Sequence, residues 1–167
     1  MMEVVKLLID KLSQYNFVTN IIPGTILCLI IKYMVGYDLF VTEEWYQMGI
    51  IFYFVGIVNN RFGSLVIEWA MKKTKIVKFA KYELFVKAEK NDSKITTLSM
   101  ENNVFRSYIA VCTLSFMTSL FKVIADNVNW VNECKTQFLL FALLILFVLS
   151  YRKQTTYVRK RVDANKE

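Results

Sequence analysis

The sequence predicts an all-α integral membrane protein: a four-helix bundle with an amphipathic N-terminal helix and a basic cytoplasmic helical loop. Hydrophobic residues make up 55% of the 167 positions, above the ~45–50% that is usual for a soluble domain. Charged residues still make up 21%, so the apolar residues must be segregated into blocks. The length suits a single membrane domain over 1–167 rather than two domains.

Four apolar blocks approach the ~20 residues that a helix needs to cross a bilayer. They cover about 17–37, 45–67, 104–125 and 136–151. Each block is continuous rather than alternating with period two, and four strands cannot close a barrel, so helices are predicted. The alternative is a soluble bundle with buried helices. The uncharged run from Phe138 to Leu149 weighs against that alternative.

The first block and the residues before it carry two further patterns. Residues 1–15 place apolar side chains at helical spacing with charged ones between them: Val4, Val5, Leu8 and Leu12. This spacing predicts an amphipathic helix on the inner leaflet, and the alternative is an extension of the first span into the cytoplasm. No basic leader precedes an apolar core, so we expect no cleaved signal peptide. Pro23 and Gly24 predict either a kink filled by packing or a hinge for gating.

Small residues recur every seven positions along the second block. They are Gly49, Gly56, Gly63 and Ala70. A stripe of small residues lets two helix backbones approach closely, which favours helix association in lipid. The stripe therefore predicts a packing surface, either for a helix of the same chain or for a second copy.

A polar collar is predicted at the cytoplasmic end of the bundle, because polar residues of three blocks lie at one depth. Its members are Asn20, Asn59, Asn60, Arg61, Glu68 and Arg106. Polar groups within a span are candidates for function because hydrocarbon penalises them. Arg61 and Glu68 are seven positions apart and would share a helix face, forming a pair that holds helices together or lines a gated mouth. The alternative for Arg61 is an interfacial anchor that reaches the headgroups.

A polar stripe marks the third block. Its members are Tyr108, Cys112, Ser115, Ser119 and Lys122. The favoured interpretation is that these side chains bond to their own backbone or to a neighbouring helix. The other interpretation is a water-facing pore lining between several copies. Ser99 is the expected N-cap of this span, with Glu101 in its first turn.

Basic residues are distributed unevenly between the loops. The segment 72–103 holds eight lysines and the tail 152–167 holds six basic residues, whereas the turn 38–44 holds three acidic residues and no basic one. The positive-inside rule then predicts a multi-pass protein of the bacterial inner membrane with both termini in the cytoplasm. Anionic lipid of the inner leaflet is the expected partner of these basic residues, in preference to nucleic acid.

The residue types argue against catalysis. Histidine is absent, which removes the usual general base and the commonest metal ligand. Cys28, Cys112 and Cys134 form no CxxC pair, and no phosphate-binding loop or hydrolase motif is present. We therefore expect no enzyme activity, catalytic residue, cofactor or metal. An enzyme that acts on lipid is the least favoured function, because no span holds paired carboxylates.

Four stretches resemble a group of small bacterial four-helix membrane proteins: NFVTNIIPG, NNRFGSLVIEW, KFAKYELFVKAEK and ENNVFRSY. The resemblance covers most of the chain and implies no catalytic residues. Short membrane proteins of this architecture accompany antiphage systems, which implies a homo-oligomeric pore-forming or membrane-perturbing effector, or an accessory subunit of a defence system. The alternative is a non-conducting anchor that recruits a cytosolic protein partner through 72–103 and the basic tail.

Overall fold

The computed structural model describes residues 14–39 and 44–165, and every regular element in these ranges is a helix. The amphipathic helix expected over 1–15 therefore lies almost entirely outside the described residues. In chain order the elements are α2 (Gln14–Asn16), η1 (Phe17–Ile21), α3 (Ile22–Ile30), η2 (Ile31–Val35), α4 (Trp45–Phe62), η3 (Gly63–Ile67), α5 (Glu68–Lys73), α6 (Tyr82–Asn91), α7 (Lys94–Asn127), α8 (Asn129–Glu133) and α9 (Lys135–Ala164). The elements η1, η2 and η3 are π-helical turns that continue the neighbouring α-helices.

Four continuous helical segments are long and apolar enough to cross a membrane. They are Phe17–Val35, Trp45–Lys73, Lys94–Asn127 and Lys135–Ala164. This finding confirms the predicted helical class and the four long apolar helices, which are the features of a multi-pass membrane protein. The last three segments extend beyond the apolar blocks, because polar residues with good helix propensity continue each helix past its apolar part.

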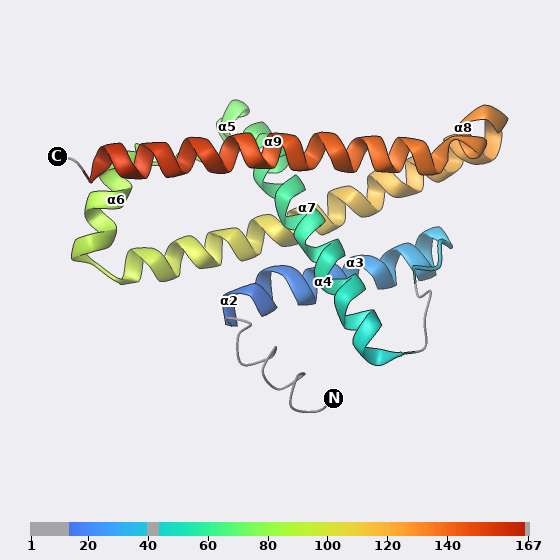
Figure 1. Ribbon diagram of the computed structural model, residues 1–167, viewed down its shortest axis with the longest axis horizontal. Coiled ribbons are helices and arrows are strands. Elements are labelled where there is room, and N and C mark those ends of the chain that lie inside the picture. The colour runs from blue at the N-terminus through green and yellow to red at the C-terminus, as the bar shows by residue number, and fades with distance from the viewer. Residues whose placement is uncertain (1–13, 40–43, 166–167) are drawn as a thin grey trace.

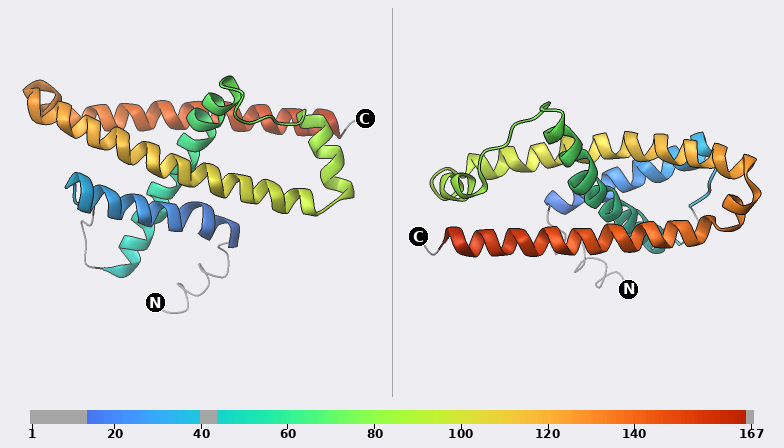
Figure 2. Two further views of the ribbon diagram at one scale, coloured as in Figure 1. Left: turned by 180° about the vertical axis from the view of Figure 1, so that it is seen from behind. Right: turned by 90° about the horizontal axis from the view of Figure 1, so that it is seen from above.

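The two longest helices, α7 and α9, form two arms that are joined at one end by α8 (Figure 1). At the other end α6 contacts both arms. The helix α4 passes between the arms and crosses them steeply (Figure 2). The first helical segment lies against α4 and α7. As a result α9 contacts α4, α6 and α8 but touches α7 little along its length, a crossing arrangement that the sequence does not predict.

The first helical segment passes through Pro23 without a break. Proline has no N–H, so it cannot make the helical bond to the carbonyl of residue 19. A wider turn accommodates this position, because the Ile22 N–H donates to the carbonyl of Phe17, five residues earlier. The segment ends at Gly36, which has a φ of +83° and donates its N–H to the Ile31 carbonyl at 2.9 Å. Pro23 thus lies in the first turn of α3, directly after a π-turn that continues into this helix.

Two glycines let α3 and α4 cross at backbone contact. A methyl group on Gly56 would collide with the backbone of Asn20, and one on Gly24 would collide with the carbonyl of Phe52. Gly63 faces the Cβ of Ala110 on α7, and an added methyl there would lie 3.3 Å from it. Gly49, by contrast, has open space around it. The small-residue stripe therefore packs within the chain at two of its glycines.

The third long helix begins earlier than the sequence predicts. The expected N-cap at Ser99 is wrong, because α7 starts at Lys94 and contains Ser99 in its second turn. The chain turns from α6 into α7 at Asp92, whose Oδ1 accepts the N–H of Lys94 at 2.9 Å. An Asp side chain that bonds to the backbone two residues ahead is a strong turn former, and it places the helix start there rather than at the apolar boundary.

Apolar side chains are covered very unevenly. Small clusters of buried residues lie between α3, α4 and α7, one built on Leu27 and Val111 and the other on Phe62 and Ala110. The apolar stretch of Phe17–Val35 is 44% buried, whereas that of Lys135–Ala164 is only 6% buried. Contiguous apolar surface of this extent is unfavourable in water. The helix α9 therefore presents an apolar surface that the described part of the chain leaves largely uncovered.

A buried polar core and the Glu68 cluster as candidate functional site

Polar side chains from three helical segments meet in the interior of the protein. We call this group the polar core: Thr19, Asn20, Asn59, Asn60 and Ser107. Asn59 on α4 is fully buried, and its Nδ2 donates to the carbonyl of Ser107 at 3.0 Å and to its Oγ at 2.9 Å. The Ser107 Oγ in turn donates to the carbonyl of Thr19 at 3.1 Å. The polar core therefore ties the first helix, α4 and α7 together.

The local sequence explains why this polar core can form. The Thr19 carbonyl lies four residues before Pro23, which has no N–H to bond with it, and the Ser107 hydroxyl supplies a donor instead. The close approach at Gly56 brings α4 near enough for Asn60 to reach Asn20 of the first helical segment. Buried polar groups that lack a partner are costly, so Asn59 and Ser107 depend on each other for their hydrogen bonds.

Asn60 extends the polar core toward a group of charged residues. Its Nδ2 donates to Oδ1 of Asn20 at 3.0 Å, and its own Oδ1 accepts Nη2 of Arg106 at 3.2 Å. Arg106 lies on α7, one residue before Ser107. Two adjacent residues of α7 therefore contact two adjacent residues of α4: Arg106 contacts Asn60, and Ser107 contacts Asn59.

The charged residues surround the carboxylate of Glu68. We call Glu68, Lys72, Arg106 and Lys153 the Glu68 cluster. Glu68 Oε1 lies 2.6 Å from Lys72 Nζ, and Oε2 lies 3.1 Å from both Arg106 Nη1 and Lys153 Nζ. The Glu68 side chain is only 9% exposed. One buried carboxylate therefore holds three cations that come from α5, α7 and α9.

The register of the second helical segment places Glu68 at this junction. Lys72 is four residues beyond Glu68 and so lies on the same face. Ser64 is four residues before Glu68, and Lys153 Nζ donates to its carbonyl at 2.5 Å and to its Oγ at 2.9 Å. Lys153 is therefore held at two points of the second helical segment. These contacts fix α9 to α5 and η3 at a position where α9 has few other neighbours.

The structure corrects the predicted pairing of Arg61 with Glu68. Glu68 is buried and Arg61 is exposed, although seven positions separate them. The π-helical turn η3 lies between the two residues and adds a residue to the turn, which rotates Glu68 away from the face of Arg61. Among the described residues, Arg106 supplies the arginine partner of Glu68. Arg61 instead borders a polar hollow of about 310 Å³ together with Asn20, Asn60 and Arg106.

The structure brings the other five residues of the predicted collar into two adjoining groups. Asn20, Asn59, Asn60, Glu68 and Arg106 all belong to the polar core or to the Glu68 cluster. Sequence reasoning missed Ser107 and Lys153. Lys153 lies just past the last apolar block and is counted among the basic residues of the tail, although a buried carboxylate at Glu68 requires cations near it. Ser107 could have been found as the partner that a buried asparagine needs.

The polar stripe of α7 divides into side chains with different surroundings. Ser115 donates to the carbonyl of Val111 at 2.8 Å, which matches the interpretation that stripe residues bond to their own helix. Lys122 donates to the carbonyl of Val35 at 2.6 Å, where it caps the end of the first helical segment. Cys112 and Ser119 are exposed, and Tyr108 is half-buried. Two polar side chains of the stripe therefore face outward from the protein.

Comparisons with protein-family models, with curated protein sequences and with solved structures find no match. The geometry of the chain itself therefore provides the functional argument. Within residues 14–39 and 44–165, no three Cys, Asp or Glu side chains gather as a metal site would require. The polar core and the Glu68 cluster bring together amides, hydroxyls and paired charges, which are groups that hold helices and attract anions.

Proposed function

We propose that this chain is a multi-pass protein of the bacterial inner membrane with both termini in the cytoplasm. Four long apolar helices support the membrane location. The start of α2, α6 and the end of α9 lie toward one side of the molecule, and α8 lies at the opposite end (Figure 1). The lysines of 72–103 and the basic tail thus share one side, as the positive-inside rule requires.

We further propose that copies of the chain associate and perturb or perforate the membrane, as an effector or accessory subunit of a defence system. The observation that supports this is the poor coverage of the arms by the rest of the chain. The apolar stretch of α7 is 17% buried and that of α9 is 6% buried. Helices in lipid associate through packing and interhelical polar contacts, and exposed Cys112 and Ser119 offer polar positions on α7. The assignment to defence rests on the sequence resemblance.

Dye release from vesicles tests this function. The purified chain is reconstituted into phosphatidylethanolamine and phosphatidylglycerol vesicles, and its oligomeric mass in detergent is measured by native mass spectrometry. We expect an oligomer and a release of trapped dye. Ser119→Leu replaces an outward-facing hydroxyl by an apolar group and should reduce release at least several-fold. Met117→Leu, on a different exposed face of α7, is the matched control and should release dye as the unmodified chain does.

A monomeric protein that leaves vesicles sealed would contradict this proposal. The second candidate function, a non-conducting anchor, would then be favoured by one specific feature. The loop after α5 and the helix α6 expose apolar side chains among lysines, with Ile76 in the loop at 70% and Leu84 on α6 at 60% exposure. A cytosolic protein bound to this segment should co-purify with the unmodified chain and be lost from the double variant Ile76→Ser, Leu84→Ser.

A further inference from the structure

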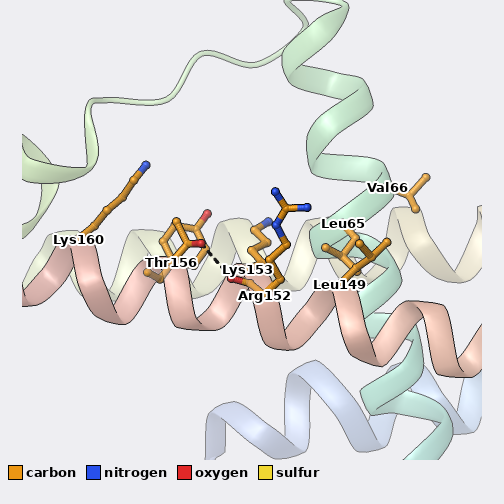
Figure 3. A pocket seen from close by; sticks show the side chains of 8 residues that line it. Leu65, Val66, Leu149, Arg152, Lys153, Thr156 and Lys160 are labelled. Carbon is orange, nitrogen blue, oxygen red and sulfur yellow. Dashed lines mark hydrogen bonds between the residues drawn. The ribbon is translucent and has the colours of Figure 1, made fainter.

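A groove lies between η3 and α9 beside the Glu68 cluster. We call it the α9 groove; it has a volume of about 430 Å³ and is lined by Leu65, Val66, Leu149, Arg152, Lys153, Thr156, Tyr157 and Lys160. Val66 and Leu149 are partly exposed in it, at 41% and 42%. The lining is apolar at one end and basic at the other (Figure 3).

The groove straddles the boundary between the apolar and basic parts of α9. No charged residue occurs between Lys135 and Arg152, and the basic residues of the tail begin at Arg152. Leu149 thus lies on the apolar side of the boundary, while Lys160 lies two helical turns beyond Arg152. In a membrane-spanning helix this transition marks the level of the lipid headgroups. The groove therefore faces headgroups and the first part of the acyl chains together.

The basic end of the groove carries charge that the described residues do not neutralise. Lys153 is bound to Glu68 and Ser64. The single negative charge of Glu68 is shared among three cations, so it does not neutralise all of them. Arg152 and Lys160 form no ion pair with any other described residue. Figure 3 shows both side chains extending from the same face of α9, on either side of Thr156. The Thr156 hydroxyl donates to the Arg152 carbonyl at 2.9 Å, so this face of α9 presents two cations in a fixed helical frame.

We propose that the α9 groove binds an anionic phospholipid of the inner leaflet. Arg152 and Lys160 hold the phosphate, because a guanidinium pairs with phosphate oxygens in two places and a lysine adds a point charge. The upper part of an acyl chain lies on Leu65, Val66 and Leu149. A water-soluble anion would use the two cations but not this apolar end, which is why the surface fits a lipid rather than free phosphate. Basic pockets between membrane helices are known to recognise anionic headgroups in this way.

The bound lipid would add a contact between η3 and α9, which Lys153 already joins through its bonds to Ser64 and Glu68. Residues of η3 line one side of the groove and residues of α9 line the other. The groove lies directly next to the contacts of Lys153 with Ser64 and Glu68. Because α9 touches α7 little, an added contact here stabilises the position of the outer arm. The inference rests on the proposed membrane location and adds a specific lipid site to it.

The test measures lipid binding and thermal unfolding of the full chain in a neutral detergent. Phosphatidylglycerol, phosphatidylcholine and inorganic phosphate are each titrated, with lipid adducts followed by native mass spectrometry. We expect phosphatidylglycerol to bind and to raise the melting temperature, and the other two to do neither. The double variant Arg152→Gln, Lys160→Gln should bind phosphatidylglycerol about 30-fold more weakly, from the usual contribution of two basic residues near anionic lipid.

A matched double variant controls for loss of charge alone. Lys90→Gln, Lys94→Gln removes the same charge from exposed side chains outside the groove and should bind as the unmodified chain does. Circular dichroism checks that both variants keep the helical content, and the single variant Lys160→Gln, at an exposed position, gives a second reading if the double variant does not fold. Three results would each overturn the lipid site. Phosphatidylcholine could bind as tightly as phosphatidylglycerol, or inorganic phosphate could raise the melting temperature as much. The groove variants could also bind phosphatidylglycerol with the affinity of the unmodified chain.

Failure of the lipid site can be distinguished from failure of the proposed membrane-perturbing function. Dye release and oligomeric mass are measured on the same groove variants. Loss of lipid selectivity with dye release intact would remove the lipid site and leave the membrane-perturbing function standing. Selective lipid binding by a chain that leaves vesicles sealed would support the lipid site and contradict only the pore.

Discussion

The Glu68 carboxylate on α5 lies 3.1 Å from the Arg106 guanidinium on α7, and that guanidinium also donates to the Asn60 side chain on α4 at 3.2 Å. Arg106 is therefore the link between the polar core and the Glu68 cluster. Its Nε is buried and makes no hydrogen bond within the described residues. A buried guanidinium is tolerated when its charge is paired, so the position of α7 depends on Glu68 remaining ionised and in place.

Glu68→Gln should destabilise the protein strongly. The substitution leaves three cations around a neutral amide, and removal of one partner from a buried ion pair costs about 3–5 kcal/mol. For a chain of this size we expect the melting temperature to fall by about 6–20 °C, measured by differential scanning fluorimetry in detergent. Glu83→Gln, at an exposed carboxylate of α6, is the control and should melt within about a degree of the unmodified chain. An equal melting temperature for Glu68→Gln would show that the cluster is not a structural junction.

Gly56→Ala should push α3 and α4 apart. The added methyl group meets the backbone of Asn20, which cannot move aside as a flexible side chain does. Overpacking of this kind costs about 1–3 kcal/mol. Gly49→Ala is the matched control, because a methyl group there meets nothing within 4 Å. Thermal unfolding of the two variants should differ accordingly, and equal melting temperatures would contradict the backbone contact at Gly56.

The depth of a residue in a predicted span depends only on its position along the helix, so depth can be predicted from the sequence. Asn20, Asn59, Asn60, Arg106 and Glu68 were placed at one level by counting residues from the ends of the apolar blocks, and they meet in the structure. The direction in which each side chain faces is harder to predict. A single π-turn between Arg61 and Glu68 changes the face of every residue after it, and nothing in the sequence of Gly63–Ile67 marks that turn.

The same limit applies to the packing of whole helices. The sequence predicts that four apolar helices associate, but the spacing of small residues does not say which helix meets Gly56 and which meets Gly63. Steric contact decides this, since Asn20 lies against one glycine and Ala110 against the other. Lys153 was missed for a related reason. It lies beyond the apolar block in the sequence, yet its contacts with Ser64 and Glu68 make it part of the interior.

A double-mutant cycle should reveal coupling between Asn59 and Ser107. Asn59→Ala removes a donor to both the carbonyl and the hydroxyl of Ser107, and Ser107→Ala leaves the Thr19 carbonyl without that donor. Each single variant should lose about 1–3 kcal/mol of stability, because a buried polar group is left without its partner. The double variant should lose less than the sum, by at least about 0.5 kcal/mol. Strict additivity in chemical denaturation would contradict the hydrogen bonds of the polar core.

Cysteine labelling should report the orientation of the chain. Cys134 is exposed at the junction of α8 and α9, at the end of the molecule opposite α6 and the end of α9, whereas Cys28 is buried between helices. In spheroplasts we expect a membrane-impermeant maleimide to label Cys134 and to leave Cys28 unmodified, because an impermeant reagent reaches only thiols on the outer face. Because the Cys112 thiol is also exposed, the labelling is done in a Cys112→Ser background, where the added variant Cys134→Ser should remove it.

Ser93→Cys in a Cys112→Ser, Cys134→Ser background provides the matching position on the other side. Ser93 is exposed at the start of α7, and its side chain makes no cap hydrogen bond, so the substitution should leave the fold unchanged. Its thiol should react only after the cells are lysed, since the start of α7 carries the lysine-rich segment that the positive-inside rule retains in the cytoplasm. Labelling of this position in intact spheroplasts, together with protection of Cys134, would invert the topology and would place the α9 groove on the outer leaflet.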